Sequence, residues 1–130
     1  MLKFNSLLLF SENPQKLADF YKKVFNMDPG WEEGGYTGFK VGKGLFMIGP
    51  HDKVHGKNKN PERMMFNLET TDVQAEFERI KKVGAKVIQK PYNPGESEAM
   101  VLATFADPDG NYFQLASPMQ MEETHSSQTN

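Results

Sequence analysis

The chain has 130 residues, of which 38% are hydrophobic, 12% aromatic and 25% charged, and its formal net charge is -2. These figures describe one soluble globular domain and exclude the strongly basic surface with which nucleic-acid-binding proteins neutralise phosphates. Cysteine is absent, which excludes disulfide bonds and zinc-cysteine sites, so we expect a protein of the reducing cytoplasm. The longest strongly apolar run, residues 7–10, is far shorter than the roughly 20 residues of a membrane-spanning helix. We therefore expect neither nucleic acid nor a membrane as a partner.

A short strand and an amphipathic helix are expected near the start of the chain. The apolar run Ser6–Phe10 predicts the strand, and Asn13 with Pro14 marks the start of a helix that ends near Phe25. Asparagine is a favourable N-cap, and proline suits the first helical position because its missing N–H has no partner there. The apolar side chains of the helix recur at the spacing of one buried face, and they are Leu17, Phe20, Tyr21 and Val24.

A β-hairpin is expected after the first helix. Its strands are Tyr36–Val41 and residues 45–49, separated by Gly42-Lys43-Gly44, in which glycine supplies the positive φ of a tight turn. The preceding segment, Trp31–Glu33, is expected to be a loop. Residues 51–62 are polar and rich in lysine, asparagine and glycine, which predicts a linker.

The second half of the chain repeats the pattern of the first at an offset of 59 residues. This offset places residues 65–69 on the first strand. It also aligns identical residues, namely Gln15 with Gln74, Lys22 with Lys81, Lys23 with Lys82, and Val24 with Val83. Both copies open with a strand-like run, pass through polar capping residues and then become helical, which predicts two similar modules.

The second copy is expected to hold a helix and three further strands. Thr71 and Gln74 match a capping box at the start of the helix, and Gly84 is expected to be its C-cap. The strands are expected at residues 86–89, 99–106 and 111–117. The last two strands are joined by the turn Asp107-Pro108-Asp109-Gly110, in which proline presets one φ and glycine relieves the tight exit.

Three segments together carry a family resemblance. They are residues 13–27 with the pair Phe20-Tyr21, the pair Asp72-Val73, and residues 105–115 with the sequence DPDGN. With these motifs the chain resembles the vicinal oxygen chelate superfamily, which contains glyoxalase I, extradiol dioxygenases, fosfomycin-resistance transferases and bleomycin-resistance proteins. The resemblance covers residues 4–118.

The resemblance implies an α+β fold of the glyoxalase/bleomycin-resistance type. Two βαβββ modules are expected to form an incomplete curved β-barrel around a cavity, usually within a homodimer. We therefore expect a single domain over residues 1–118, with modules at about 4–50 and 63–118, a linker at about 51–62, and a polar tail at 119–130.

The resemblance also implies where a metal would bind. In metal-dependent members one divalent ion takes ligands, commonly His and Glu, from the first and last strands of each module. The equivalent positions here are Ser6 and Met65 on the first strands, and Met47 and Gln114 on the last strands. Thioethers are too soft for Mg, Mn or Zn, and neutral oxygens do not offset the charge of the ion. Moving the alignment of each strand by one residue does not recover a set of metal ligands. We therefore expect no metal and no other cofactor, and the resemblance assigns no catalytic residue.

Two interpretations of these positions stay open. Ser6, Met47, Met65 and Gln114 either line a ligand cavity or fill the space of a lost metal site. Four aromatic residues near the expected cavity mouth, Trp31, Tyr36, Phe39 and Tyr92, either offer flat ligand-binding surfaces or pack within the sheet. His51 and His55 have a metal-ligand spacing, but their loop setting favours exposed histidines.

These observations lead to one main functional hypothesis and two alternatives. The main hypothesis is a small organic molecule bound without a metal in the cavity of a homodimer, similar to the bleomycin-resistance type. The first alternative is a metal-dependent lyase of the glyoxalase I class with an atypical ligand set. The second is a structural dimeric module with a filled cavity.

Overall fold

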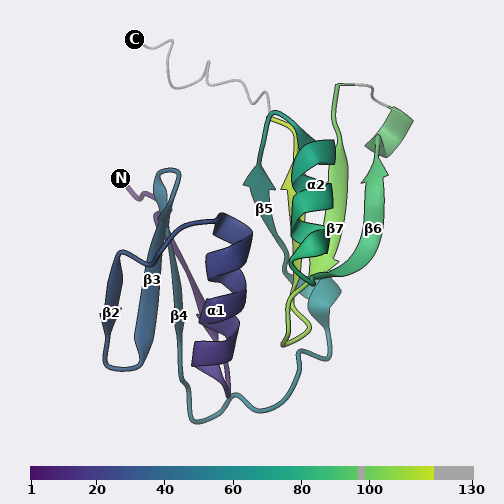
Figure 1. Cartoon of the computed structure of the whole chain (residues 1–130). Coiled ribbons are helices and arrows are strands. Elements are labelled where there is room, and N and C mark those ends of the chain that lie inside the picture. The colour runs from purple at the N-terminus through teal and green to yellow at the C-terminus, as the bar shows by residue number, and fades with distance from the viewer. Residues whose placement is uncertain (97–98, 119–130) are drawn as a thin grey trace.

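The computed structural model describes residues 1–96 and 99–118, so the polar tail expected at 119–130 lies outside the described residues. Two four-stranded sheets lie side by side, and each carries one helix on one of its faces (Figure 1). The sheets do not close into a barrel. Neither helix of the described segments combines the length and the apolar character that crossing a membrane requires.

The first module forms sheet A. Its elements are β1 (Ser6–Phe10), α1 (Pro14–Phe25), β2 (Trp31–Glu33), β3 (Tyr36–Val41) and β4 (Gly44–Gly49). The strand order is β1-β4-β3-β2, with β1 parallel to β4 and the other pairs antiparallel. The prediction of a loop at residues 31–33 is wrong, because this segment pairs with β3 and forms the edge strand β2. Three exposed residues are too few to show an alternating pattern.

The second module forms sheet B. Its elements are β5 (Phe66–Glu69), α2 (Val73–Lys82), β6 (Lys86–Tyr92), β7 (Leu102–Ala106) and β8 (Tyr112–Ala116), with 3-10 turns at Pro61–Arg63 and Pro94–Glu96. The order β5-β8-β7-β6 and the parallel pairing of β5 with β8 reproduce the topology of sheet A. The two βαβββ modules expected from the sequence are therefore confirmed.

The helix termini differ in detail from the sequence expectations. The prediction of a capping box formed by Thr71 and Gln74 is wrong. Asp72 is the N-cap, and its carboxylate accepts a hydrogen bond from the N–H of Ala75 at 3.0 Å. Asn13 is the N-cap of α1, but its side chain makes no capping hydrogen bond. The C-cap expected at Gly84 is wrong by one residue, because Val83 is the C-cap of α2 and Gly84 follows it with a φ of 102°.

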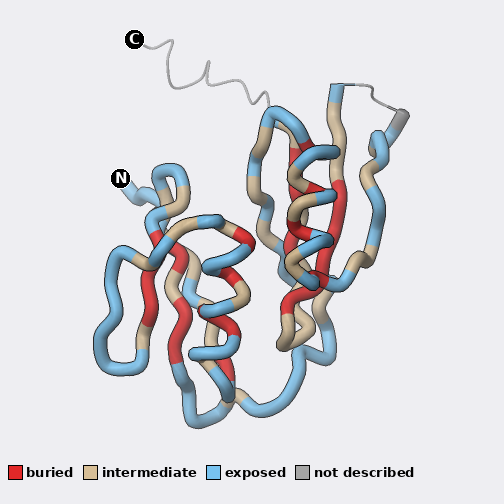
Figure 2. The backbone as a smooth tube through the Cα atoms, in the orientation of Figure 1, coloured by how far each residue is buried: buried red, intermediate tan, exposed pale blue. Residues whose placement is uncertain are grey.

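The core lies between the helices and the sheets, and its buried segments occur on the helix and the inner strands of each module (Figure 2). Alternate strand residues point toward the helices, and in β4 these are Phe46 and Ile48. Aromatic rings connect the modules, since Phe66 of β5 lies 5.1 Å from Phe46 and 6.1 Å from Tyr21 of α1, measured between centroids. One continuous core therefore spans both modules.

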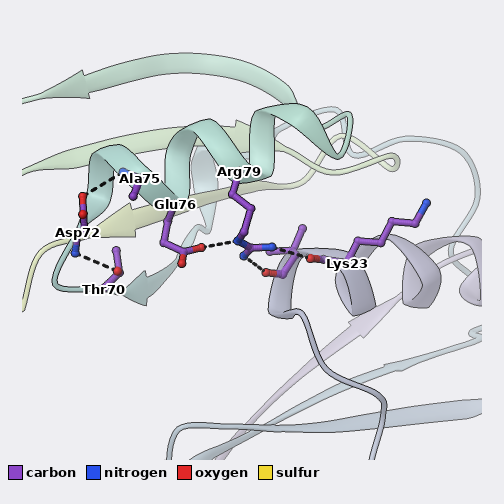
Figure 3. Close-up of polar contacts among 7 residues, drawn as sticks. Lys23, Thr70, Asp72, Ala75, Glu76 and Arg79 are labelled. Carbon is purple, nitrogen blue, oxygen red and sulfur yellow. Dashed lines mark hydrogen bonds and ion pairs between the residues drawn. The ribbon is translucent and has the colours of Figure 1, made fainter.

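Polar contacts reinforce the junction between the modules. Arg79 of α2 donates hydrogen bonds to the carbonyl oxygens of Lys23 at 3.0 Å and Val24 at 2.6 Å, at the C-terminal end of α1 (Figure 3). Its Nε also donates to Glu76 at 2.8 Å. Because the last carbonyls of a helix lack partners within the helix, this guanidinium satisfies two groups that would otherwise depend on water.

Candidate functional site

The face of sheet A opposite α1 is open. Leu8 of β1 is 50% exposed and Leu45 of β4 is 44% exposed. Strand pairing places Ser6 beside Leu45, and Leu8 beside Met47, all on this face. Ser6 and Met47, two of the positions singled out in the sequence, therefore share one surface.

Sheet B presents a corresponding, partly open face opposite α2, on which Asn67 is exposed, Gln114 is half-buried and Thr104 is buried. Gln114 of β8 pairs with Asn67 of β5 and with Thr104 of β7, and these side chains share this face. The Gln114 amide Nε2 donates a hydrogen bond to the Thr104 hydroxyl at 3.1 Å. Met65 directly precedes β5 and is 45% exposed. Of the second pair of positions, Gln114 thus lies in sheet B and Met65 lies directly before its strand β5.

Within one chain the four positions do not line a common pocket. Ser6 borders a groove of about 710 Å³ between β1, the β3-β4 hairpin and β5. Met47 borders a separate pocket of about 290 Å³ on sheet A. Met65 and Gln114 border neither. The donor set also fails as a site for a hard divalent ion, because it holds two thioethers, one hydroxyl and one amide that is already bonded to Thr104.

The 290 Å³ pocket is built around the indole of Trp31. Trp31 pairs with Gly38, and its ring lies so close over this glycine that a Cβ there would sit 3.1 Å from Cε3. Three further side chains on this face border the pocket, namely those of Leu45, Met47 and the exposed Lys40. The pocket therefore combines an aromatic wall, apolar neighbours and a cationic rim.

The other three aromatic candidates lie in different surroundings. The Tyr36 ring covers Gly49, where a Cβ would overlap the ring, and its edge contacts Phe10 at a centroid distance of 6.4 Å. Phe39 is fully buried, with its ring 5.2 Å from that of Phe25 in the core, so only its backbone reaches the pocket face. Tyr92 lies at the end of β6 in sheet B and is 42% exposed.

The two loop histidines lie beside Glu12 and Asp52. His55 Nδ1 is 3.9 Å from a Glu12 carboxylate oxygen, and His51 Nδ1 accepts a hydrogen bond from the N–H of Lys53 at 3.1 Å. Within residues 1–96 and 99–118, no group of three His, Cys, Asp or Glu side chains is arranged to hold a metal ion.

A buried polar cluster at the junction of the modules was not found by sequence reasoning. The Tyr21 hydroxyl donates a 2.7 Å hydrogen bond to Asp107, whose carboxylate also accepts from the backbone N–H groups of Asp109 and Asn111 and from the Asn111 amide. Burial raises the pKa of Tyr21 well above 10.0, and the charge of Asp107 acts in the same direction. Burial also raises the pKa of Asp107 above 3.8, against the opposing effect of the hydrogen bonds from Tyr21 and Asn111. The DPDGN motif thus has a structural role that links β7 and β8 to α1.

The comparison with protein families settles the relationship that this geometry suggests. A family model described as the Glyoxalase/Bleomycin resistance protein/Dioxygenase superfamily matches residues 3–115. The chain belongs to this superfamily. The resemblance found in residues 13–27 and 105–115 is thereby confirmed. No curated protein sequence matches the chain.

Solved structures from this superfamily share the fold. A glyoxalase-related enzyme from Fulvimarina pelagi is 15% identical, with a TM-score of 0.72 over 91% of this chain and 89% of that chain. A glyoxalase/bleomycin resistance protein/dioxygenase from Nocardioides is 11% identical, with a TM-score of 0.74 over 94% and 91%. A family enzyme from Burkholderia phytofirmans PsJN is 17% identical, with a TM-score of 0.69 over 88% and 98%. At these identities the likeness shows the fold and leaves the chemistry to the residues of this chain.

Proposed function

We propose that this protein binds a small organic molecule without a metal ion, as bleomycin-resistance proteins of the superfamily sequester their ligands. The observation that carries the proposal is the donor set Ser6, Met47, Met65 and Gln114 at the positions where metal-dependent members hold their ion. Thioethers pack against apolar ligands, and an amide offers both a donor and an acceptor. These groups suit an organic ligand, whereas a divalent ion requires charged or imidazole donors.

The proposal includes a homodimer whose two copies enclose the ligand. Both helices lie on the same side of the two sheets, so the open faces of sheets A and B lie side by side in one chain (Figure 1). A two-fold axis that sets sheet A of one copy against sheet B of the other would cover Leu8, Leu45 and Met65, which are 44–50% exposed. The same arrangement would bring the pair Ser6 and Met47 opposite the pair Met65 and Gln114.

A thermal-shift screen tests ligand binding directly. We expect some compounds of a small-organic-molecule library to raise the melting temperature equally with EDTA and without it. A ligand present at 100 times its Kd stabilises the folded state by about 2.7 kcal/mol, which is readily measured. A rise that requires a divalent ion would overturn the proposal in favour of the metal-dependent lyase, and a library without any effect would favour the structural module.

Restoring the metal ligands tests the meaning of the four positions. We expect the combined variant Ser6→His, Met47→Glu, Met65→His and Gln114→Glu to bind Ni²⁺ or Zn²⁺ in calorimetry, while the original chain binds neither. The matched control carries only the two changes of sheet A, which supply half of the ligands. Metal binding by the original chain, or equal binding by the half-substituted control, would contradict the proposal.

The dimer is tested by sedimentation equilibrium. We expect a mass of two chains, and we expect Leu8→Glu to shift the equilibrium toward monomer because a charge would be buried in the interface. Lys16→Glu changes an exposed residue of α1, away from the open faces, and is the matched control. A monomer at all concentrations would contradict the enclosed cavity.

A further inference from the structure

We infer that the pocket beside Trp31 takes a planar aromatic molecule that carries a negative charge. This inference rests on the proposed function, because it names the class of ligand for the open face of sheet A. Three properties of the pocket carry it, namely a flat wall, apolar neighbours and an isolated positive charge.

The flat wall is the indole of Trp31. The ring lies over Gly38, which pairs with Trp31 across β2 and β3, and a methyl group on Gly38 would be in tight contact with the ring carbon Cε3. The absence of a side chain at residue 38 therefore lets the indole lie close to the sheet. Trp31 remains 44% exposed, so part of its surface is available for stacking. Indole rings stack well on other planar rings.

The apolar neighbours set the size and polarity of the ligand. Met47 pairs with Gly38 on β3 and Leu45 pairs with Lys40, so both apolar side chains stand next to the indole. The pocket volume of about 290 Å³ is near the lower end of the roughly 300–1,000 Å³ of small-molecule sites, which suits one or two fused rings. The thioether of Met47 is flexible and makes favourable contacts with aromatic rings.

The charge of the pocket comes from Lys40. Among the residues that line the pocket, all within the described segments, Lys40 alone is charged. No ion pair formed by Lys40 is present in the described parts of the chain. The nearest acidic residue on this face of β2 is Glu33, which pairs with Tyr36 away from Lys40 and does not line the pocket. An indole face attracts cations as well as aromatic rings, but the Lys40 ammonium disfavours a second cation and favours an anion.

The test compares three naphthalene compounds that differ mainly in charge: 2-naphthoate, 2-naphthylmethanol and 2-naphthylmethylammonium. Calorimetry on the full chain at low ionic strength is expected to rank them in that order of affinity. Trp31 is the one tryptophan of the chain, so naphthoate is expected to quench the tryptophan fluorescence directly. We expect Trp31→Ala to weaken naphthoate binding by roughly tenfold, and Trp31→Phe to retain part of the affinity.

Variants of Lys40 test the charge separately. Lys40→Gln is expected to weaken naphthoate by roughly two- to fivefold while leaving naphthylmethanol unchanged, and Lys40→Glu is expected to invert the order of anion and cation. Lys43→Gln removes the same charge from the neighbouring hairpin loop, outside this pocket, and is the matched control. Circular dichroism and melting temperature establish that each variant is folded.

The outcomes separate this inference from the proposed function. An equal or greater affinity for the cation, naphthoate binding unchanged by Trp31→Ala, or no binding of any naphthalene compound would overturn the inference. The proposed function would survive such results if other organic molecules still raise the melting temperature in EDTA. Stoichiometric bound metal would overturn the proposed function itself.

Discussion

Glycine at two positions of sheet A decides how two aromatic side chains lie. Gly38 lies under Trp31, and Gly49 lies under Tyr36. The sequence predicted the hairpin glycines, since a turn is a local pattern, and Gly42 has the expected positive φ of 60°. The contacts of Gly38 and Gly49 join different strands, and no local pattern contains them. Lys40 lies at the rim of the Trp31 pocket because of its neighbours on adjacent strands. No local sequence pattern shows these neighbours, so the charged rim was not predicted.

The close contact at Gly49 leads to a stability prediction. Gly49→Ala is expected to lower the free energy of unfolding by about 1–3 kcal/mol, because the new methyl group would overlap the Tyr36 ring. Gly30→Ala is the matched control, since no atom lies within 4 Å of its Cβ position. Urea denaturation measures both. Equal effects of the two substitutions would contradict the packing of Tyr36 on Gly49.

Tyr21 leads to a prediction for alkaline pH. Its phenol is buried and bonded to Asp107, so Tyr21→Phe is expected to cost about 1.5–3 kcal/mol near neutral pH, compared with little for the exposed control Tyr92→Phe. The folded-state pKa of Tyr21 is raised, so its contribution to stability is complete below pH 10.0, the ordinary value, and is lost as the pH rises above it.

Denaturation between pH 8 and pH 11.5 measures this contribution. The free energy of unfolding is expected to fall less steeply with pH in Tyr21→Phe than in the original chain, because only the original chain has this phenol to ionise. Identical slopes for the two proteins above pH 10 would show that Tyr21 ionises as easily in the folded state as in the unfolded state.

At the scale of elements, the helices were predicted more accurately than their caps. The apolar spacing in residues 14–25 defines α1 in full, because the buried face of a helix is a periodic property of the sequence. The start of α2 was misplaced by one residue, since Thr71 and Asp72 are both good N-cap residues and only the structure shows that Asp72 accepts the capping hydrogen bond. The edge strand β2 was not predicted because its extended conformation depends on pairing with β3, which the local sequence does not show.

The N-cap of α2 can be tested with two neighbouring substitutions. Asp72→Ala is expected to lower the free energy of unfolding by about 1 kcal/mol, because the N–H of Ala75 loses its acceptor. Thr71→Ala is expected to change it by less than about 0.5 kcal/mol, the usual range for exposed positions without special contacts. Thermal or urea denaturation of both variants distinguishes the two caps. A larger effect at Thr71 would restore the capping box.

At the scale of the whole molecule, the contacts between modules hold one core together. The sequence repeat predicted two modules of like topology, but their junction depends on pairs separated by more than 50 residues, such as Arg79 with Lys23 and Val24. The equivalence of Ser6, Met47, Met65 and Gln114 came from the family resemblance. Their assignment to two modules and the homodimer were already expected from that resemblance, whereas the cross-strand neighbours Leu45 of Ser6 and Thr104 of Gln114 became visible only in three dimensions.

Arg79 tests the junction between the modules. Arg79→Met is expected to lower the free energy of unfolding by about 1–3 kcal/mol, because two carbonyl groups of α1 lose a charged donor. Arg79→Lys is expected to recover only part of the loss, since lysine lacks the planar fork of donors. Lys82→Met, on the exposed end of α2, is the matched control. A loss at Lys82 as large as that at Arg79 would show that general charge near the helix end, rather than the link to α1, is responsible.

We propose that this chain keeps the superfamily fold without the metal site of the metal-dependent members. The most direct measurement is the metal content of the protein purified without an affinity tag, followed by its melting temperature with Ni, Zn, Mn, Fe and Mg. We expect no stoichiometric metal and no saturable rise in melting temperature with any of the five ions. One ion bound per chain, or a rise that saturates at one ion per chain, would contradict it and would favour the metal-dependent lyase.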